Sequence, residues 1–244
     1  MNYSETLKTL EDIVREVGEK HFTNVKDFTC SEKQDGSLVT EIDISVDASL
    51  SKKLKEVFPS VLFISEESQS DVAQTQGLVW CIDPIDGTHN FVNNIQYFAV
   101  SVGLLLNGAP LLGVIYDPTS GDILSGGSGI GVFLNKEDML IENTSNIIVS
   151  GRSHSDSDKK REQLVINSIL ESNLKYRRFG SLALDLMNLV RGRIGAVRII
   201  GNSIWDWSAG YAIAKEAGYV VNHHSDNNII IHSASLSELV SVIK

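Results

Sequence analysis

The sequence lacks several features that mark particular classes of protein. It has no run of about 20 apolar residues, the length that a membrane-spanning helix requires. Its first 20 residues contain scattered acids and no apolar core, so we expect no signal peptide. Its two cysteines, Cys30 and Cys81, provide no disulfide framework. We therefore expect a protein of the reducing cytoplasm that has no membrane partner.

Positive charge is also scarce. The chain has 21 Lys and Arg against 31 Asp and Glu, which gives a net charge of −10. Because proteins that bind a nucleic-acid backbone use basic patches, we expect no nucleic-acid partner. A small phosphorylated metabolite is compatible with this charge if cations bridge the acids and the phosphate. The hydrophobic content of 42% is that of an ordinary globular protein.

The first part of the chain has the pattern of an antiparallel sheet accompanied by helices. An amphipathic helix is predicted near the N-terminus, and a second one over Asp43–Val57. Strand-like runs follow at Tyr97–Leu106, Pro110–Tyr116 and Ile123–Ser125, with turn sequences between them. The glycine-rich stretch GGSGIGVFLN lacks the Gly-Lys-Ser/Thr ending of a P-loop, so it favours a hairpin over a phosphate cradle.

The second part alternates strands with helices, which is typical of an α/β arrangement. Helices are predicted over Leu182–Val190 and Asp206–Ala217, with short apolar strands around them. We place the boundary near residues 143–146. The expected organisation is an α+β fold with two subdomains, 1–145 being α+β and 146–244 being α/β.

The segment WCIDPIDGTHNF, residues 80–91, places two acids where a buried strand ends. Asp83 and Asp86 flank Pro84, which restricts the backbone. Gly87 permits a sharp turn, and Thr88 could open a helix whose first N–H groups bind an anion. A plain turn is the alternative interpretation, because Asp-Pro and Asp-Gly are common turn dipeptides.

Four other acids lie at the ends of predicted elements. Glu66 and Glu67 follow the short strand VLFIS, Asp43 heads a helix, and Asp206 lies between two tryptophans at the start of another helix. Each has a simpler explanation as part of a solvated loop or as a helix cap. If these carboxylates converge, only cations make the site tolerable. An all-oxygen ligand set favours Mg²⁺ or Mn²⁺ over zinc.

Five motifs in this order resemble the inositol monophosphatase family, which belongs to the lithium-sensitive, Mg²⁺-dependent phosphatases. They are SLVTEID, SEES, WCIDPIDGTHNF, FGSLALDLMNLVRGR and IWDWSAGYAIAKEAG, and together they span nearly the whole chain. Ser65 stands where the family usually has Gly, and Ser208 where it usually has Ala. The resemblance implies a layered α/β sandwich of the sugar phosphatase type, with an N-terminal antiparallel sheet and a C-terminal α/β half. It also implies a homodimer.

The resemblance assigns metal ligands residue by residue. Glu66, Asp83 and the backbone carbonyl of Ile85 match the ligands of a first metal. Asp83, Asp86 and Asp206 match those of a second, and a third, weaker Mg²⁺ site near Glu66 is usual. The implied cofactor is therefore two or three Mg²⁺ ions, with Mn²⁺ as an alternative.

Catalytic and substrate-binding roles follow from the same resemblance. Asp43, Thr88 and Glu66 match catalytic positions, and the first two would orient and deprotonate the attacking water. Lys33 is our choice for the lysine of the family's mobile loop. The positions implied to bind substrate are Asp86, Gly87, Thr88, Gly180, Ser181 and Asp206.

The substrate is less well defined than the chemistry. Counting back from Asp206, the family's inositol-facing Glu falls at Ile199, and a nearby His falls at Ser203. We expect hydrolysis of inositol monophosphate or a related sugar or polyol phosphate. Fructose 1,6-bisphosphate, histidinol phosphate and 3′-phosphoadenosine 5′-phosphate are alternatives, although Ile85 and Asn90 depart from the last branch. Intact acids at every proposed ligand position disfavour a non-catalytic binding protein.

Overall fold

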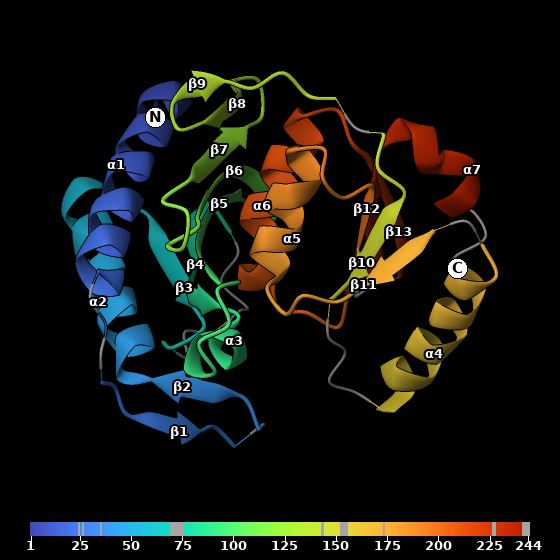
Figure 1. The fold of residues 1–244 in the computed structure, drawn as a ribbon. Coiled ribbons are helices and arrows are strands. Elements are labelled where there is room, and N and C mark those ends of the chain that lie inside the picture. Colours follow the sequence, from blue (N-terminus) through green and yellow to red (C-terminus); the bar gives the residue numbers. More distant parts are fainter. Residues whose placement is uncertain are drawn as a thin grey trace.

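The computed structural model describes residues 1–23, 25, 27–34, 36–68, 76–142, 144–151, 156–172, 174–225 and 228–240, with the side chains of 156–162, 225 and 239 excepted. These residues form alternating layers of helix and sheet (Figure 1). A helical layer, a seven-stranded sheet, a second helical layer and a five-stranded sheet follow one another across the molecule. No helix in the described part of the chain is long and apolar enough to span a membrane.

The seven-stranded sheet carries the first half of the chain. Its strands, in spatial order, are β3 (Leu62–Ser65), β4 (Leu78–Asp86), β5 (Ala99–Leu106), β6 (Ala109–Tyr116), β7 (Ile123–Gly127), β8 (Gly131–Leu134) and β9 (Glu137–Asp138). All neighbours are antiparallel except β3, which pairs with β4 in parallel. The predicted antiparallel sheet is therefore confirmed with one parallel edge strand. The glycine-rich stretch forms the β7–β8 hairpin, as predicted.

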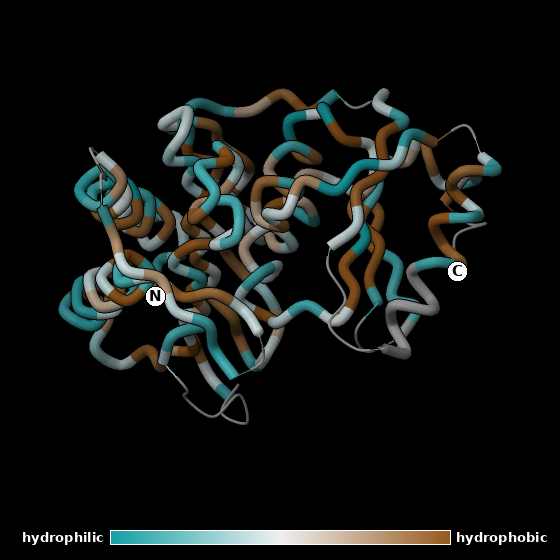
Figure 2. Tube along the Cα trace, turned by 60° about the horizontal axis from the view of Figure 1, so that its bottom comes forward, coloured by the Kyte–Doolittle hydropathy of each residue, from teal (hydrophilic) through white to brown (hydrophobic). Residues whose placement is uncertain are grey.

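Two amphipathic helices cover one face of this sheet. Helix α1 (Tyr3–Phe22) buries Leu7, Leu10, Val14 and Val17, and helix α2 (Glu41–Val57) lies beside it. Their chains alternate between hydrophobic and hydrophilic residues in Figure 2, as expected for helices with one buried face. A separate two-stranded sheet of β1 (Cys30–Glu32) and β2 (Leu38–Thr40) precedes α2.

The second half of the chain forms the five-stranded sheet. In spatial order its strands are β11 (Lys175–Arg177), β10 (Ile147–Ser150), β12 (Ala196–Ile200), β14 (Asn228–His232) and β13 (Val220–Ser225). Strand β10 pairs in parallel with both β11 and β12, whereas β14 pairs antiparallel with β12 and β13. The other elements are α4 (Asp156–Leu170), η1 (Ala234–Leu236) and α7 (Ser237–Val240). The predicted α/β half is thus a mixed sheet.

Helices α5 (Leu182–Val190) and α6 (Ile204–Glu216) lie between the two sheets (Figure 1). Their apolar side chains belong to one core that also includes Ile115 of the first sheet and Val197 of the second. Burial of this shared layer fixes the two halves against each other. The boundary at 145/146 stays a prediction. Strands β9 and β10 lie on either side of it, and residue 143 lies outside the described residues.

Candidate metal and phosphate site

Asp83 and Asp86 lie at the end of β4, where its pairing with β5 is interrupted. The register runs regularly to Asp83 opposite Ser101 and resumes with Asp86 opposite Ala99. Pro84 has no N–H to donate to the ladder, so an irregularity at this point is expected. Only 1% of Asp83 and 8% of Asp86 are exposed. The plain-turn interpretation is therefore wrong, because both acids belong to the buried end of a strand.

The Asp-Gly-Thr turn after β4 packs tightly against the turn that precedes α5. Gly87 has φ 96°, in the left-handed region that favours glycine. A Cβ atom at Gly87 would lie 3.0 Å from the carbonyl oxygen of Gly180 and 3.2 Å from Cβ of Ser181. Helix α3 (Thr88–Val92) begins directly after this turn, so its first N–H groups have no acceptor inside the helix.

The start of α5 also holds Asp86. Its Oδ2 atom accepts hydrogen bonds from Oγ of Ser181 at 2.5 Å and from the backbone N–H of Ala183 at 2.6 Å. Ser181 is the N-cap of α5, and its Oγ atom accepts a bond from the N–H of Leu184. The turns around Gly87 and Gly180 and the first turn of α5 therefore position this carboxylate together.

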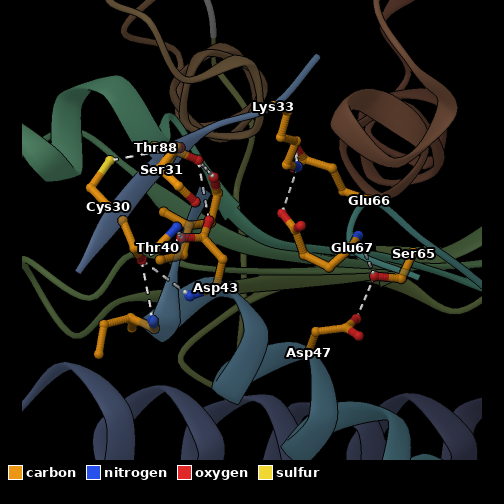
Figure 3. Close-up of polar contacts among 12 residues, drawn as sticks. Cys30, Ser31, Lys33, Thr40, Asp43, Asp47, Ser65, Glu66, Glu67 and Thr88 are labelled. Atoms are coloured by element: carbon orange, nitrogen blue, oxygen red, sulfur yellow. Dashed lines mark hydrogen bonds and ion pairs between the residues drawn. The ribbon is translucent and has the colours of Figure 1, made fainter. Parts of the chain in front are cut away.

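Asp43 is connected to Thr88 across the site (Figure 3). Thr40 is the N-cap of α2, and Asp43 is the third helical residue of the same capping box, so the alternative explanation as a helix cap is right about the box but not about the cap residue. Oδ2 of Asp43 accepts hydrogen bonds from the N–H and hydroxyl of Thr40, at 2.8 and 2.5 Å. Oδ1 lies 3.2 Å from Oγ1 of Thr88, which lies 3.0 Å from the carbonyl oxygen of Ile85.

Asp206 has an equivalent place at the start of α6. Ser203 is the N-cap, and Oδ2 of Asp206 accepts from its backbone N–H at 3.0 Å. The same oxygen accepts from Nδ2 of Asn202 at 3.2 Å. Asp206 thus belongs to the capping box, as its alternative explanation suggested, but the cap residue lies three positions earlier. Both acids occupy the last position of a Ser/Thr-x-x-acid pattern, which presents the carboxylate at a helix start.

Glu66 and Glu67 follow β3 and share one lysine (Figure 3). Nζ of Lys33, between β1 and β2, lies 2.9 Å from Oε1 of Glu66 and 2.8 Å from Oε1 of Glu67. Burial alone would lower the pKa of Lys33, but the bonds to Glu67 and Glu66 outweigh it and raise that pKa. Ser65 donates a hydrogen bond to Asp47 of α2, which gives the departure from the family's Gly a structural role.

The ends of these elements enclose a cavity of about 240 Å³. The sequence-predicted residues that line it are Glu66, Asp83, Ile85, Asp86, Gly87, Thr88, Gly180, Ser181 and Asp206. Asp43 is fully buried behind Thr88 and is not one of the described lining residues. The structure thus brings the predicted positions together around one space, with Asp43 one hydrogen bond away.

Burial and mutual repulsion raise the pKa values of the acids in this cavity. Burial is the largest cause for Asp83, followed by the charge of Glu66 and then those of Asp86 and Asp206, and the pKa lies well above its usual range. Burial and the charge of Asp86 raise the pKa of Asp206 to about 8. The pKa of Asp86 is raised to about 6, because hydrogen bonds from α5 offset part of the burial. A concentration of carboxylates at this cost indicates a functional site.

The donor set fits a hard divalent cation. In the described part of the chain, no three His, Cys, Asp or Glu side chains form a ready-made metal cluster, and Glu66 is held by Lys33. Even so, Oδ1 of Asp83 is buried and has no hydrogen-bond partner among the described residues. Several carboxylates around one cavity are tolerable when a cation compensates their charge. All the donors are oxygen atoms, which suits Mg²⁺ or Mn²⁺.

Some features of the cavity differ from the sequence expectations. Ile199, the position that counting assigns to the family's inositol-facing Glu, is 2% exposed, packs in the core between the sheets and is not among the described residues that line the cavity. Asp185 and Arg178 line the cavity instead, and neither was singled out from the sequence. Asp185 lies within the motif FGSLALDLMNLVRGR, where an acid in an apolar helix start was the available signal.

Comparisons with known proteins agree with this geometry. The profile of the inositol monophosphatase family matches residues 2–240. The inositol-1-monophosphatase of Bacillus subtilis is 30% identical over 226 residues, 89% of this chain and 84% of that protein. The Nus factor SuhB of Pasteurella multocida is 28% identical over 207 residues, 83% of this chain and 78% of that protein.

The fold has the same relatives. The crystal structure of the extragenic suppressor protein suhB from Bartonella henselae superposes with a TM-score of 0.87 over 98% of both chains, at 24% identity. At this identity the likeness shows the fold, and it confirms the expected layered arrangement. The family profile matches nearly the whole length of the chain, so it shows family membership in addition to the fold. The chain therefore belongs to the inositol monophosphatase family.

Proposed function

We propose that this protein is a Mg²⁺-dependent phosphomonoesterase that hydrolyses inositol monophosphate or a related sugar or polyol phosphate. One observation carries the proposal. A single cavity of about 240 Å³ is lined by Glu66, Asp83, Asp86 and Asp206, together with the turn that begins α3. Acids that would hold cations and N–H groups that would hold phosphate are thus placed against each other.

The residues divide into two groups by what they would bind. Glu66, Asp83, Asp86, Asp206 and the carbonyl of Ile85 would hold Mg²⁺, with Mn²⁺ as a substitute. Bound there, the metal would neutralise phosphoryl charge and make water a better nucleophile.

The backbone N–H groups at Gly87 and Thr88 would hold phosphate oxygens at the start of α3. Helix α3 has five residues. We therefore assign this binding to the individual N–H groups and not to a helix dipole.

Thr88 and Asp43 would manage the proton of the attacking water. The Thr88 hydroxyl has one proton, which it can donate to Oδ1 of Asp43 at 3.2 Å or to the carbonyl of Ile85 at 3.0 Å. A water in the cavity can donate to the same hydroxyl oxygen, while Thr88 passes its own proton to Asp43. Burial raises the pKa of Asp43, which makes it a better proton acceptor than an exposed aspartate. Two hydrogen bonds from Thr40 hold the carboxylate in place.

The same geometry supports alternatives at the level of the substrate. Fructose 1,6-bisphosphate, histidinol phosphate and 3′-phosphoadenosine 5′-phosphate contain a phosphomonoester that the same groups would bind. A non-catalytic role is suggested by the relative named Nus factor SuhB. The retained acids favour catalysis, because a scaffold gains nothing from buried carboxylates that repel one another.

The test is phosphate release from inositol 1-phosphate and from these three alternative compounds, with Mg²⁺ and with a chelator. We expect release from inositol 1-phosphate or another polyol phosphate that depends on Mg²⁺ and is lost in Asp86→Asn. The control Glu11→Gln removes a buried carboxylate from α1, on the far side of the first sheet, and should retain activity. Folded wild-type protein that releases no phosphate from any compound would contradict the proposal.

A further inference from the structure

Asp185 is a buried acid in the cavity wall that none of the roles above uses. It lies in the first turns of α5, is 1% exposed and still lines the cavity. Its Oδ1 atom accepts a hydrogen bond from the hydroxyl of Tyr97 at 2.8 Å. A buried carboxyl needs partners for both of its oxygens. If Tyr97 donates its proton to Oδ1, the second oxygen, Oδ2, must find its partner elsewhere.

The neighbouring residues settle that direction. NH1 of Arg193 donates to Oδ1 of Asn188 at 3.1 Å, which orients the amide of Asn188. The other end of the amide, Nδ2, therefore donates to the hydroxyl oxygen of Tyr97, also at 3.1 Å. With its oxygen accepting from Asn188, Tyr97 directs its proton to Asp185. The three hydrogen bonds from Arg193 through Asn188 and Tyr97 to Asp185 therefore all donate in the same direction, toward the carboxyl group that lines the cavity.

Ring packing and hydrogen bonds connect the residues around Asp185 to one another. The ring of Tyr97 packs against the ring of Phe179, with centroids 5.1 Å apart. Nδ2 of Asn90 donates to the backbone carbonyls of both residues, at 2.7 and 2.8 Å. The segments before β5 and before α5 are therefore joined beside the cavity, which Asn90 and Asp185 line. A substrate group that reaches this wall would meet a fixed surface.

The second oxygen of Asp185 remains for a ligand. Oδ2 has no hydrogen bond to any of the described residues, whereas Oδ1 accepts the bond from Tyr97. We propose that Asp185 binds a hydroxyl group of the substrate and selects for polyol or sugar phosphates over phosphates without hydroxyls. Burial raises the pKa of Asp185, as does the charge of Asp86. A hydroxyl both donates and accepts, so it can pair with Oδ2 whether the carboxyl is ionised or neutral.

This inference rests on the proposed phosphatase function and names the part of the substrate that the cavity recognises. The matched probes are inositol 1-phosphate and cyclohexyl phosphate, which has the same six-membered ring without hydroxyls. The quantity to measure is kcat/KM for inositol 1-phosphate divided by kcat/KM for cyclohexyl phosphate, both in the presence of Mg²⁺. A hydrogen bond that involves a buried carboxyl is expected to change this ratio about tenfold to 100-fold.

Two variants and one control make the test specific. Asp185→Ala should lower the ratio by that factor through KM for inositol 1-phosphate. Asp185→Asn keeps a partner for Tyr97 and an amide for the hydroxyl, so it should restore most of the ratio. Glu11→Gln removes a buried acid remote from the cavity and should leave the ratio unchanged. A purely structural Asp185 would instead lower kcat/KM for both phosphates alike, which would overturn the inference.

Failure of the proposed function gives a different result. If wild-type protein turns over neither of these phosphates nor any of the three alternative compounds, the phosphatase proposal falls, and calorimetric titration with inositol 1-phosphate and cyclohexyl phosphate then tests the hydroxyl site. Tighter binding of inositol 1-phosphate that is lost in Asp185→Ala would support the site. Equal affinity for both compounds in wild-type protein would overturn it. Asp185→Ala could fail to fold. In that case, a kcat/KM ratio near one in wild-type protein and the same ratio in Asp185→Asn would overturn the inference.

Discussion

Replacing Asp86 by Asn should stabilise the metal-free protein and abolish the proposed Mg²⁺-dependent release of phosphate. The pKa of Asp86 rises from the ordinary 3.8 to about 6 in the folded protein. At about 1.4 kcal/mol per pKa unit, ionising this group above pH 6 costs the folded state about 3 kcal/mol. Asn can accept the hydrogen bonds from Ser181 and Ala183 as the neutral carboxyl does, so it resembles the protonated form of Asp86. The expected gain at pH 7 is therefore about 3 kcal/mol.

The sign follows from the order of the two pKa values. Because the folded pKa of Asp86 lies above the unfolded one, the folded protein keeps its proton to higher pH than the unfolded chain. Its contribution to stability is therefore greatest below about pH 4 and is lost as the pH rises through about 6. Asp86→Asn should remove this pH dependence, so that its advantage over the wild type grows from pH 4 to pH 7.

The assay is urea denaturation of both proteins with a chelator, repeated with Mg²⁺. Mg²⁺ at 100 times its dissociation constant should stabilise the wild type by about 2.7 kcal/mol and the variant by much less. Glu11→Gln is the matched control, because Glu11 is also a buried acid whose pKa is raised by burial, yet it lies in α1. It should keep the full Mg²⁺ response. A metal-free Asp86→Asn that is less stable than the wild type, or that responds equally to Mg²⁺, would refute this reasoning.

Three further predictions concern single contacts. Thr88→Val should lower kcat for phosphate release by about 10²-fold to 10⁴-fold with little change in KM, because the hydroxyl that donates to Asp43 is lost. An unchanged kcat would exclude the proton path through Thr88. Gly87→Ala should lower the free energy of unfolding, measured in urea, by about 1–3 kcal/mol more than Gly121→Ala, because both glycines have positive φ but only Gly87 lies against neighbouring backbone. An equal loss of stability in the two variants would contradict this close approach. Asn90→Leu should destabilise by about 2–3 kcal/mol, because two carbonyls lose their donor; a change within 0.5 kcal/mol, the ordinary surface value, would argue against that role.

Local signals in the sequence were enough for most of the architecture. Alternating and helical apolar patterns predict the strands around Val100 and Val114 and the helix from Leu182, because burial of one face imposes those periods. Turn residues predict the hairpin between β7 and β8. The parallel pairing of β3 with β4 was not predicted, since strand direction depends on contacts between segments distant in the chain.

The site was predictable only through a resemblance between motifs. Each acid had a local explanation as a turn or a cap, and spacing alone does not bring Asp43, Asp83 and Asp206 together from three elements. The structure shows that two of these local explanations were nearly right, because Asp43 and Asp206 do belong to capping boxes. A capping position and a place at the cavity are compatible, since a helix start presents the carboxylate outward from the helix.

Substrate recognition was the least predictable part. Counting along the motif pointed to Ile199, whose side chain faces the core. Asp185 could not be distinguished by its sequence context, because its role depends on Tyr97, which is 88 positions away. Interactions of this range arise from packing between the two halves of the chain, and no local pattern encodes them.

Hydrolysis of inositol 1-phosphate in water enriched in oxygen-18 would show whether water attacks the phosphorus atom with the help of a bound metal. With Mg²⁺, we expect each released phosphate to carry one labelled oxygen, and we expect the chelator and Asp86→Asn to stop the release. Release that continues at the same rate without a divalent metal, or phosphate that carries no label, would contradict this mechanism.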